Sequence, residues 1–281
     1  MTVAERIRAG LGRCSPAERR VGRLLLSDYP AAGLDTVARL AERAETSGPT
    51  VLRFLSRLGF EGFGDLQDAL RGELAERTTS PLTVLTTESG PSPDDTLLGR
   101  AQAVLPGATA RTLELLPPDE LDTAVSLLSD RRYRISADGG RFTRLLAEYL
   151  VRHLMQVRAD TRILPGEPLA RTDVLLDIGR RDVLVLFDFR RYEPATRTLA
   201  EECAEAGAKI ILVTDRWLSP IAGTADVVLP AQVDTLGAYD SLVPSLAIVE
   251  VLVAGVLSAS GDDAERRLTR FEDSSRRHGL I

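Results

Sequence analysis

Hydrophobic residues recur with a helical period throughout residues 1–77. After the capping pair Asp35-Thr36, an i, i+3, i+4, i+7 apolar set predicts a short helix over about 37–44. A second helix is predicted over 47–58, because Pro49 fits its first turn and Gly59 supplies a stop. The apolar residues of this second helix are Val51, Phe54, Leu55 and Leu58. The pattern therefore predicts an all-α first block with two short helices joined by a tight turn.

Beyond residue 96 the pattern changes to short apolar runs that alternate with helical periods. Strands are predicted over 132–137, 182–189, 209–214 and 226–229, and a long apolar helix over about 239–258. The run DVLVLFDF at 182–189 is nearly all apolar, which is typical of a parallel strand buried on both faces. This order predicts a layered α/β domain with a parallel sheet and right-handed crossovers.

Residues 78–95 are rich in Thr, Ser, Pro and Gly, which indicates a linker. The predicted organisation is a helical domain at 1–77, a linker at 78–95 and an α/β domain at 96–281. The net charge of -6 argues against broad nucleic-acid binding. However, the first 80 residues carry 12 Arg against 11 Asp and Glu, so the acidic excess lies in the second domain. A local nucleic-acid site on the helical domain remains compatible with the charge.

The two short helices have the arrangement with which helix-turn-helix proteins enter the major groove of DNA. If the apolar set of the second helix faces the core, then Thr50, Arg53 and Arg57 face outward, and Ser47 lies at the helix N-terminus. Arginine reads guanine edges or holds phosphates, and hydroxyl groups beside a helix N-terminus bind phosphate. The alternative is a plain helical hairpin with solvated arginines, and spacing alone leaves both open.

The segment from Leu40 to Leu70 resembles the N-terminal domain of the RpiR-like family of bacterial transcription regulators. The matching residues are Leu40-Ala41, Ser47, Thr50-Val51, Arg53-Phe54, Leu58-Gly59-Phe60, Gly62-Phe63, Leu66 and Leu70. Thr46 departs from the family pattern, which usually has Val in the turn. The resemblance implies a second domain of the sugar isomerase (SIS) type, a three-layer parallel α/β fold that senses phosphosugars. Residues 212–215, 219–222 and 225–229 are similar to the later motifs of that domain.

The resemblance also implies a ligand site in loops that follow the strands, where the family binds phosphate with hydroxyl groups on Gly-rich turns. In the first loop Gly139 and Gly140 keep the flexible turn, but Arg141 stands where a Ser is expected. Ser219 occupies a later position that lies near the ligand in the family. It can also cap a helix that begins at Pro220, and the strength of N-cap preferences favours the cap.

The second loop departs further from the family pattern. Asp188 and Arg190 stand at its two Ser positions, Arg191 replaces the Gly, and Glu193 falls at or beside the Thr. One interpretation is that Arg141, Arg190 and Arg191 form a clamp for a phosphate or carboxylate. The other is that the acidic and basic residues pair among themselves and close the pocket, because buried charges need partners.

No catalytic residue, metal site or cofactor is predicted. The two His and two Cys are scattered along the chain, and the helical carboxylates Glu148, Glu201 and Glu250 fit surface or interface roles. The sequence therefore predicts a ligand-responsive DNA-binding transcription regulator of sugar or related carbon metabolism. The alternatives are a phosphosugar isomerase-type enzyme and a regulator whose closed pocket binds no ligand.

The expected partners are a double-stranded DNA operator, a small anionic or sugar-like effector, and further copies of the chain. Apolar faces at about 95–104 and 239–258 are wide enough for a homodimer or homotetramer interface. The first ten residues lack an apolar leader and no apolar run reaches about 18 residues, so we expect no membrane association and a cytoplasmic location.

Overall fold

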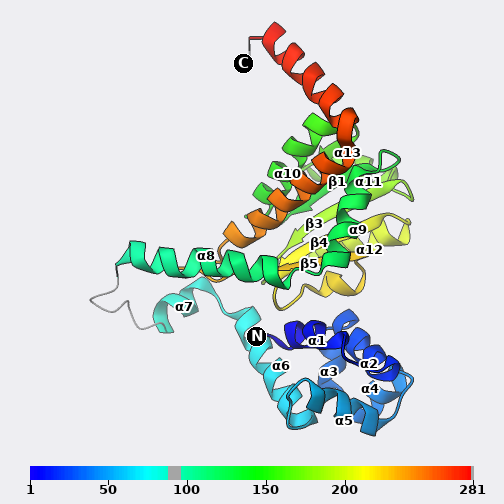
Figure 1. Cartoon of the computed structure of the whole chain (residues 1–281), viewed down its shortest axis with the longest axis vertical. Coiled ribbons are helices and arrows are strands. Elements are labelled where there is room, and N and C mark those ends of the chain that lie inside the picture. The colour runs from blue at the N-terminus through cyan, green and yellow to red at the C-terminus, as the bar shows by residue number, and fades with distance from the viewer. Residues whose placement is uncertain (88–95, 280–281) are drawn as a thin grey trace.

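The structure is a computed structural model, and it describes residues 1–87 and 96–279. The N-terminal domain is helical throughout (Figure 1), as predicted. Capping boxes begin its first two helices, formed by Thr2 with Glu5 and by Ser15 with Glu18. The helices are α1 (Val3–Leu11), α2 (Pro16–Ser27), α3 (Ala31–Leu34), α4 (Val37–Arg43), α5 (Gly48–Arg57) and α6 (Phe63–Thr78).

The core of the helical domain contains one residue from the other domain. Ile7, Leu40, Phe54 and Leu55 are fully buried in this core, as their helical spacing predicts. Leu218, which follows the fourth strand of the sheet, is 1% exposed and packs into the same cluster. Its backbone takes a left-handed φ of 59°, a conformation that costs about 1–2 kcal/mol for a residue with a side chain. Burial of a leucine side chain is worth a similar amount, about 1.5–3 kcal/mol, and offsets that cost.

The second domain contains a parallel sheet in the order β2-β1-β3-β4-β5 within the described residues. The strands are β1 (Arg134–Gly139), β2 (Thr161–Ile163), β3 (Asp182–Asp188), β4 (Lys209–Asp215) and β5 (Val227–Ala231). The four predicted strands are therefore present with shifted ends. The sequence did not reveal the edge strand β2, because three residues are too few to show a period. Gly139 pairs in register with Phe187, and Asp188 with Thr214, so the central strands end together.

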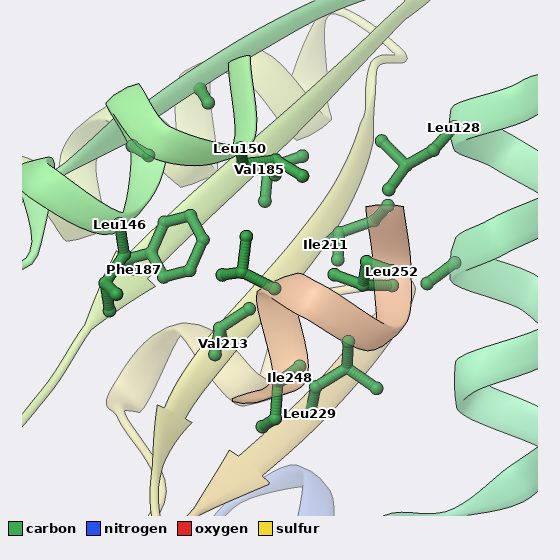
Figure 2. Packing of buried hydrophobic residues seen from close by; sticks show 14 of the residues in the cluster. Leu128, Leu146, Leu150, Val185, Phe187, Ile211, Val213, Leu229, Ile248 and Leu252 are labelled. Atoms are coloured by element: carbon green, nitrogen blue, oxygen red, sulfur yellow. The ribbon is translucent and has the colours of Figure 1, made fainter. Parts of the chain in front are cut away.

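Helices cover both faces of the sheet and complete three layers. One face packs against α9 (Pro118–Ser129), α10 (Arg144–Val157) and the first part of α13 (Val243–Arg277). Figure 2 shows this core, where Val185 lies by Leu150 and Phe187 by Leu146, while Ile248 and Leu252 approach from α13. The other face packs against α11 (Pro168–Leu176), α12 (Pro194–Glu205) and the short helix η1 (Pro220–Gly223).

Helix α13 begins later and ends later than predicted. The expected range was about 239–258, whereas α13 spans Val243–Arg277 with a break at Gly261, whose φ is 47°. Its last part extends away from the sheet (Figure 1). By length and composition α13 could cross a membrane, but Ile248, Val249, Leu252 and Val256 are buried against the sheet. These four residues form the face of α13 that packs on the sheet.

The predicted linker is partly helical. Helix α6 continues to Thr78, and α7 (Pro81–Thr87) lies inside the range 78–95, while 88–95 falls outside the described residues. The next helix, α8 (Leu97–Leu115), is longer than the expected 95–104 and contains Pro106 within it. It crosses beside the sheet domain toward α9 (Figure 1).

Candidate nucleic-acid interface and sensor cavity

The turn between α4 and α5 is held by an arginine from another helix. Glu45 takes a left-handed φ of 48°, and the Thr46 amide donates to the Ala41 carbonyl at 2.9 Å. The Arg20 guanidinium donates to the carbonyls of Ala44 and Glu45 at 3.1 and 2.9 Å. Two backbone acceptors left over by the turn are thereby satisfied, and α5 is fixed relative to α2.

A line of polar side chains starts at the N-terminus of α5. The Ser47 and Thr50 hydroxyl groups lie 3.0 Å apart, and Arg53 donates from Nη2 to the Thr50 hydroxyl at 2.9 Å. Ser47 and Arg53 are exposed, but Thr50 is only 7% exposed, so the expectation that it faces outward was wrong. Thr50 lies at the edge of the exposed face of α5, where Ser47 and Arg53 cover its side chain.

Arg57 is the fourth predicted DNA-binding residue, and its positive charge is already paired with a carboxylate. Its Nε lies 3.5 Å from the Glu18 carboxylate of the α2 capping box, and its Nη1 donates to the Arg13 carbonyl at 3.4 Å. Arg53 differs, because no ion pair is found for it among the described residues, and its contact is a neutral hydroxyl group. Arg53 is therefore the cation of α5 with the more available charge.

The outward face of α5 includes residues that the sequence reasoning missed. Leu52 is 46% exposed, and Ser56 is also exposed, one turn away from it on the helix. Together with Pro49 and Arg53 they form an i, i+3, i+4, i+7 stripe, the complement of the apolar core stripe. The sequence did contain a signal for Leu52, because this leucine falls outside the apolar core set of the helix and directly precedes Arg53. In Figure 1, α5 lies on the side of its domain away from the sheet.

A cavity of about 600 Å³ lies at the carboxyl ends of β1 and β3, where ligands bind in parallel sheets. Its wall includes six of the eight predicted ligand residues. These are Gly140, Arg141, Asp188, Arg190, Arg191 and Glu193. Phe142, which follows Arg141 in the first loop, also lines the cavity. Thr79, Pro81 and Tyr239 line it as well, and these three come from distant parts of the chain. No local sequence pattern could have brought them to the same site.

The remaining two predicted residues lie behind the wall. At Gly139 a Cβ would stand 2.8 Å from the Arg144 amide nitrogen, so its missing side chain allows the start of α10 to approach the strand. Ser219 is 1% exposed, and its hydroxyl both caps the Ile221 amide at 3.1 Å and contacts the Asp188 carboxylate. The cap preferred from the sequence is present in the structure.

The three arginines of the predicted clamp have different surroundings. Arg190 forms a bidentate ion pair with Asp240, in which Nε lies 2.6 Å from Oδ2. Arg141 and Arg191 are exposed, and across 1–87 and 96–279 neither has an ion-pair partner. The loop therefore combines one internal ion pair with two cations at the cavity mouth.

Two buried carboxyl groups lie beneath these cations. Burial raises the pKa of Asp188 to about 7 against the hydrogen bond from Ser219, and the nearby Asp215 carboxylate adds to the rise. Burial raises the pKa of fully buried Asp215 to about 6, although it accepts hydrogen bonds from the Tyr192 hydroxyl at 2.7 and 2.9 Å. It also accepts from the amides of Arg190 at 2.5 Å and Trp217 at 2.9 Å. Asp215 thus holds the backbone of the second loop.

Within the part of the chain that the structure describes, no three potential ligands from His, Cys, Asp and Glu are gathered for a metal ion.

Two family profiles match the chain. A profile described as a helix-turn-helix domain of the rpiR family matches residues 1–77, and one described as the SIS domain matches residues 127–255. The first contains the α4–α5 unit, and the second contains both cavity loops.

Curated relatives include regulators and a bifunctional protein. The chain is 27% identical over 281 residues to the HTH-type transcriptional regulator HexR of Pseudomonas aeruginosa, covering 96% of this chain and 94% of that protein. It is 28% identical over 230 residues to the bifunctional protein glk of Burkholderia mallei, and this match spans only 34% of that longer protein.

Solved structures share the fold. The sugar isomerase domain of an RpiR transcription factor from Sphaerobacter thermophilus matches with a TM-score of 0.58 and 24% identity, covering 64% of this chain and 99% of that one. The NanR protein of Vibrio vulnificus complexed with ManNAc-6P matches with a TM-score of 0.54 and 17% identity, covering 97% of each chain.

Proposed function

This chain belongs to the RpiR-like family of bacterial transcription regulators, and we propose that it controls genes of sugar or related carbon metabolism in the cytoplasm. It binds a double-stranded operator through α5, and a small anionic sugar in the cavity alters that binding. The helix-turn-helix and SIS combination and the regulator HexR among its relatives assign the chain to regulators rather than to isomerases.

The observation that carries the DNA-binding proposal is the exposure of two polar side chains, Ser47 and Arg53, at the start of α5. Ser47 supplies a hydroxyl group beside a helix N-terminus, where a phosphate is favoured. Arg53 presents a guanidinium with which no carboxylate of the described residues pairs, and its fork fits the O6 and N7 acceptors of guanine. Leu52 adds an apolar contact of the kind that thymine methyl groups receive.

The effector proposal rests on the cavity and on the charges at its mouth. Arg141 and Arg191 offer a place for a phosphate or a carboxylate, and Asp188 at the wall can accept hydrogen bonds from sugar hydroxyl groups. A volume of about 600 Å³ suits a molecule of monosaccharide size. NanR, a relative in fold, has been solved with a phosphorylated amino sugar, which supports the same ligand class.

We also propose that the protein acts as a homodimer or homotetramer. The start of α8 exposes Leu97 and Leu98, at 66% and 68%, while α13 exposes Val243 and Leu257, at 46% and 43%. Apolar side chains at this level of exposure on two helices favour burial against a second copy. Two-fold symmetry would pair two α5 helices with an inverted-repeat operator. Light scattering coupled to gel filtration tests this, and a monomer at micromolar concentration contradicts it.

Selection of duplexes from a randomised DNA pool by the full-length protein tests the DNA-binding half. We expect enrichment of one inverted repeat, bound at least about 1000-fold more tightly than unselected DNA at equal salt. A pool that stays random after repeated rounds overturns the proposal.

Thermal shift tests the effector half with glucose 6-phosphate, D-gluconate and the neutral polyol sorbitol. An anionic sugar at about 100-fold above its dissociation constant should stabilise the protein by roughly 2.7 kcal/mol, and sorbitol should not. Arg191→Ala should weaken the shift, whereas Arg152→Ala, on the exposed face of α10, should leave it unchanged. No shift with either anionic sugar would favour the closed-pocket alternative.

A further inference from the structure

We infer that the effector cavity is shared between the sheet domain and the linker that leaves the DNA-binding domain, and that α6 of the DNA-binding domain is tied directly to the loop that would hold the anion. This inference rests on the proposed function and extends it by naming the route between the two sites. Neither site alone requires such a route, because the α5 surface lies in the DNA-binding domain, whereas the predicted ligand loops of the cavity lie in the sheet domain.

The first observation concerns the cavity wall. Thr79 and Pro81 line the cavity; Thr79 directly follows α6, which ends at Thr78, and Pro81 begins α7. Arg190 and Asp240, which also line the cavity, belong to the sheet domain. A molecule that fills the cavity would therefore contact the chain that leaves the DNA-binding domain as well as the sensor loop.

The second observation is a contact from the end of α6 to the loop. Arg77 is 8% exposed, and its guanidinium carbon lies 4.7 Å from the centre of the Tyr192 ring. The Tyr192 hydroxyl donates to Asp215, which also accepts from the Arg190 amide at 2.5 Å. A cation over an aromatic ring is attracted more strongly when the pair is shielded from water. Arg77 thus reaches the backbone of Arg190 through two intervening side chains.

The third observation is a parallel contact from the preceding residue. The Trp217 indole donates to the Glu76 carboxylate at 3.1 Å, and Arg216 lies 3.5 Å from the same oxygen. The Arg190 guanidinium stands 5.4 Å from the centre of the Trp217 ring. Adjacent residues of α6 therefore contact two neighbours of the same arginine, which makes the connection specific to the loop rather than a general domain contact.

These contacts give a physical route for regulation. An anion that enters beside Arg190 competes with Asp240 for its guanidinium and shifts the residue whose amide is bonded to Asp215. Tyr192 and Trp217 share that carboxylate, so the change reaches Arg77 and Glu76 on α6. Helix α6 packs on α5, so its movement repositions the DNA-binding surface. Linkage requires the reverse as well: DNA binding must alter the loop.

Trp217 makes the route measurable without knowledge of the effector, because it is the only tryptophan in the chain. The experiment records Trp217 emission of the full-length protein as the selected duplex is added. We expect the emission to change on DNA binding although Trp217 lies in the sheet domain, and the change to saturate at the dissociation constant found by anisotropy. Unchanged emission under saturating DNA overturns the inference.

Variants separate the route from a general effect of binding. Arg77→Met and Tyr192→Phe should still bind the duplex but should lose at least half of the emission change. Arg71→Met, on the same helix but 61% exposed and paired with Asp68, should retain the change. Tyr192→Phe removes a single hydroxyl group and serves if Arg77→Met does not fold. An unaltered response in both route variants overturns the inference while the proposed function stands; a wild type that binds no duplex removes the proposed function itself.

Discussion

The α5 surface and the sensor loop both depend on arginines, but they treat the charge in opposite ways. Arg53 on α5 is exposed, and its guanidinium donates to the neutral hydroxyl group of Thr50. The Arg190 side chain is 15% exposed and is held by the Asp240 carboxylate. The first charge remains available to a polyanion, whereas the second must leave an internal partner before a ligand can use it.

The contrast explains why the two sites can be coupled. An exposed cation binds DNA phosphates with little rearrangement, so affinity depends mainly on charge and salt. A desolvated ion pair resists separation, because each charge would lose its partner in a poorly solvated place. A ligand that does separate the pair must therefore rearrange the loop, and such rearrangement is what a sensor needs.

The largest expected effect tests whether the loop depends on its buried acceptor. Asp215→Ala removes the acceptor of the Tyr192 hydroxyl and of the Arg190 and Trp217 amides, so the free energy of unfolding should fall by about 3 kcal/mol or more. Asp215→Asn keeps one acceptor oxygen and should cost less. Urea unfolding measures both, and a loss below about 1 kcal/mol for Ala would show that the loop does not need this anchor.

A second test compares the two exposed arginines of α5. Arg53→Ala should weaken operator binding by about 1–3 kcal/mol if Arg53 reads a base. Arg57→Ala should cost less, because Glu18 already compensates that guanidinium. Anisotropy at fixed salt provides the measurement, with Arg152→Ala as an exposed control. Equal losses of operator affinity for the two variants would show that pairing of Arg57 with Glu18 does not reduce its contribution to DNA binding.

The third prediction concerns pH and the buried carboxyl groups. The pKa of Asp188 is about 7 in the folded protein, above its ordinary value of 3.8, so the folded state holds a proton that the unfolded state releases. The contribution of Asp188 to the free energy of unfolding is therefore largest below pH 4 and is lost as pH rises toward 7. Asp188→Asn should flatten this dependence and gain at least about 1 kcal/mol at pH 8 relative to wild type. Equal slopes for the two proteins between pH 5 and 8 would contradict it.

The smallest effect is expected at Leu52, which is 46% exposed. Leu52→Ala should leave the free energy of unfolding within about 0.5 kcal/mol of wild type, because little packing is lost. Operator affinity should fall by about 0.5–1 kcal/mol, mainly for duplexes with thymine at one position. Competition between duplexes that differ at that base pair measures it. An equal loss of affinity for all duplexes would show that Leu52 contacts DNA without discriminating between base pairs.

Much of the fold was predictable because its signals are local. The apolar period gave α4 and α5, and continuous apolar runs gave β3 and β4. Six cavity residues were predicted because the resemblance to the SIS domain implies a ligand site in the loops that follow its strands. The burial of Thr50 was missed, because a position at the edge of a helix is decided by its neighbours' side chains rather than by period.

The rest of the cavity depends on contacts that no local pattern encodes. Asp240 lies 50 residues from Arg190 in the sequence, and Glu76 lies 141 residues from Trp217. Thr79 falls in a segment whose composition indicates a linker, although it lines the sensor cavity. Such pairings follow from how the domains pack, and the packing follows from surfaces assembled only after each domain has folded.

The burial of Leu218 in the helical core bears on how such proteins can be recombined. Two domains joined by a linker invite exchange of one sensor for another by cutting between residues 78 and 95. Here such a cut would remove one leucine from the helical core, and Gly223 approaches the Ser27 carbonyl so closely that a Cβ would stand 2.4 Å from it. A chimera that keeps this DNA-binding domain must therefore also retain residues 216–223 of the sensor domain that it replaces.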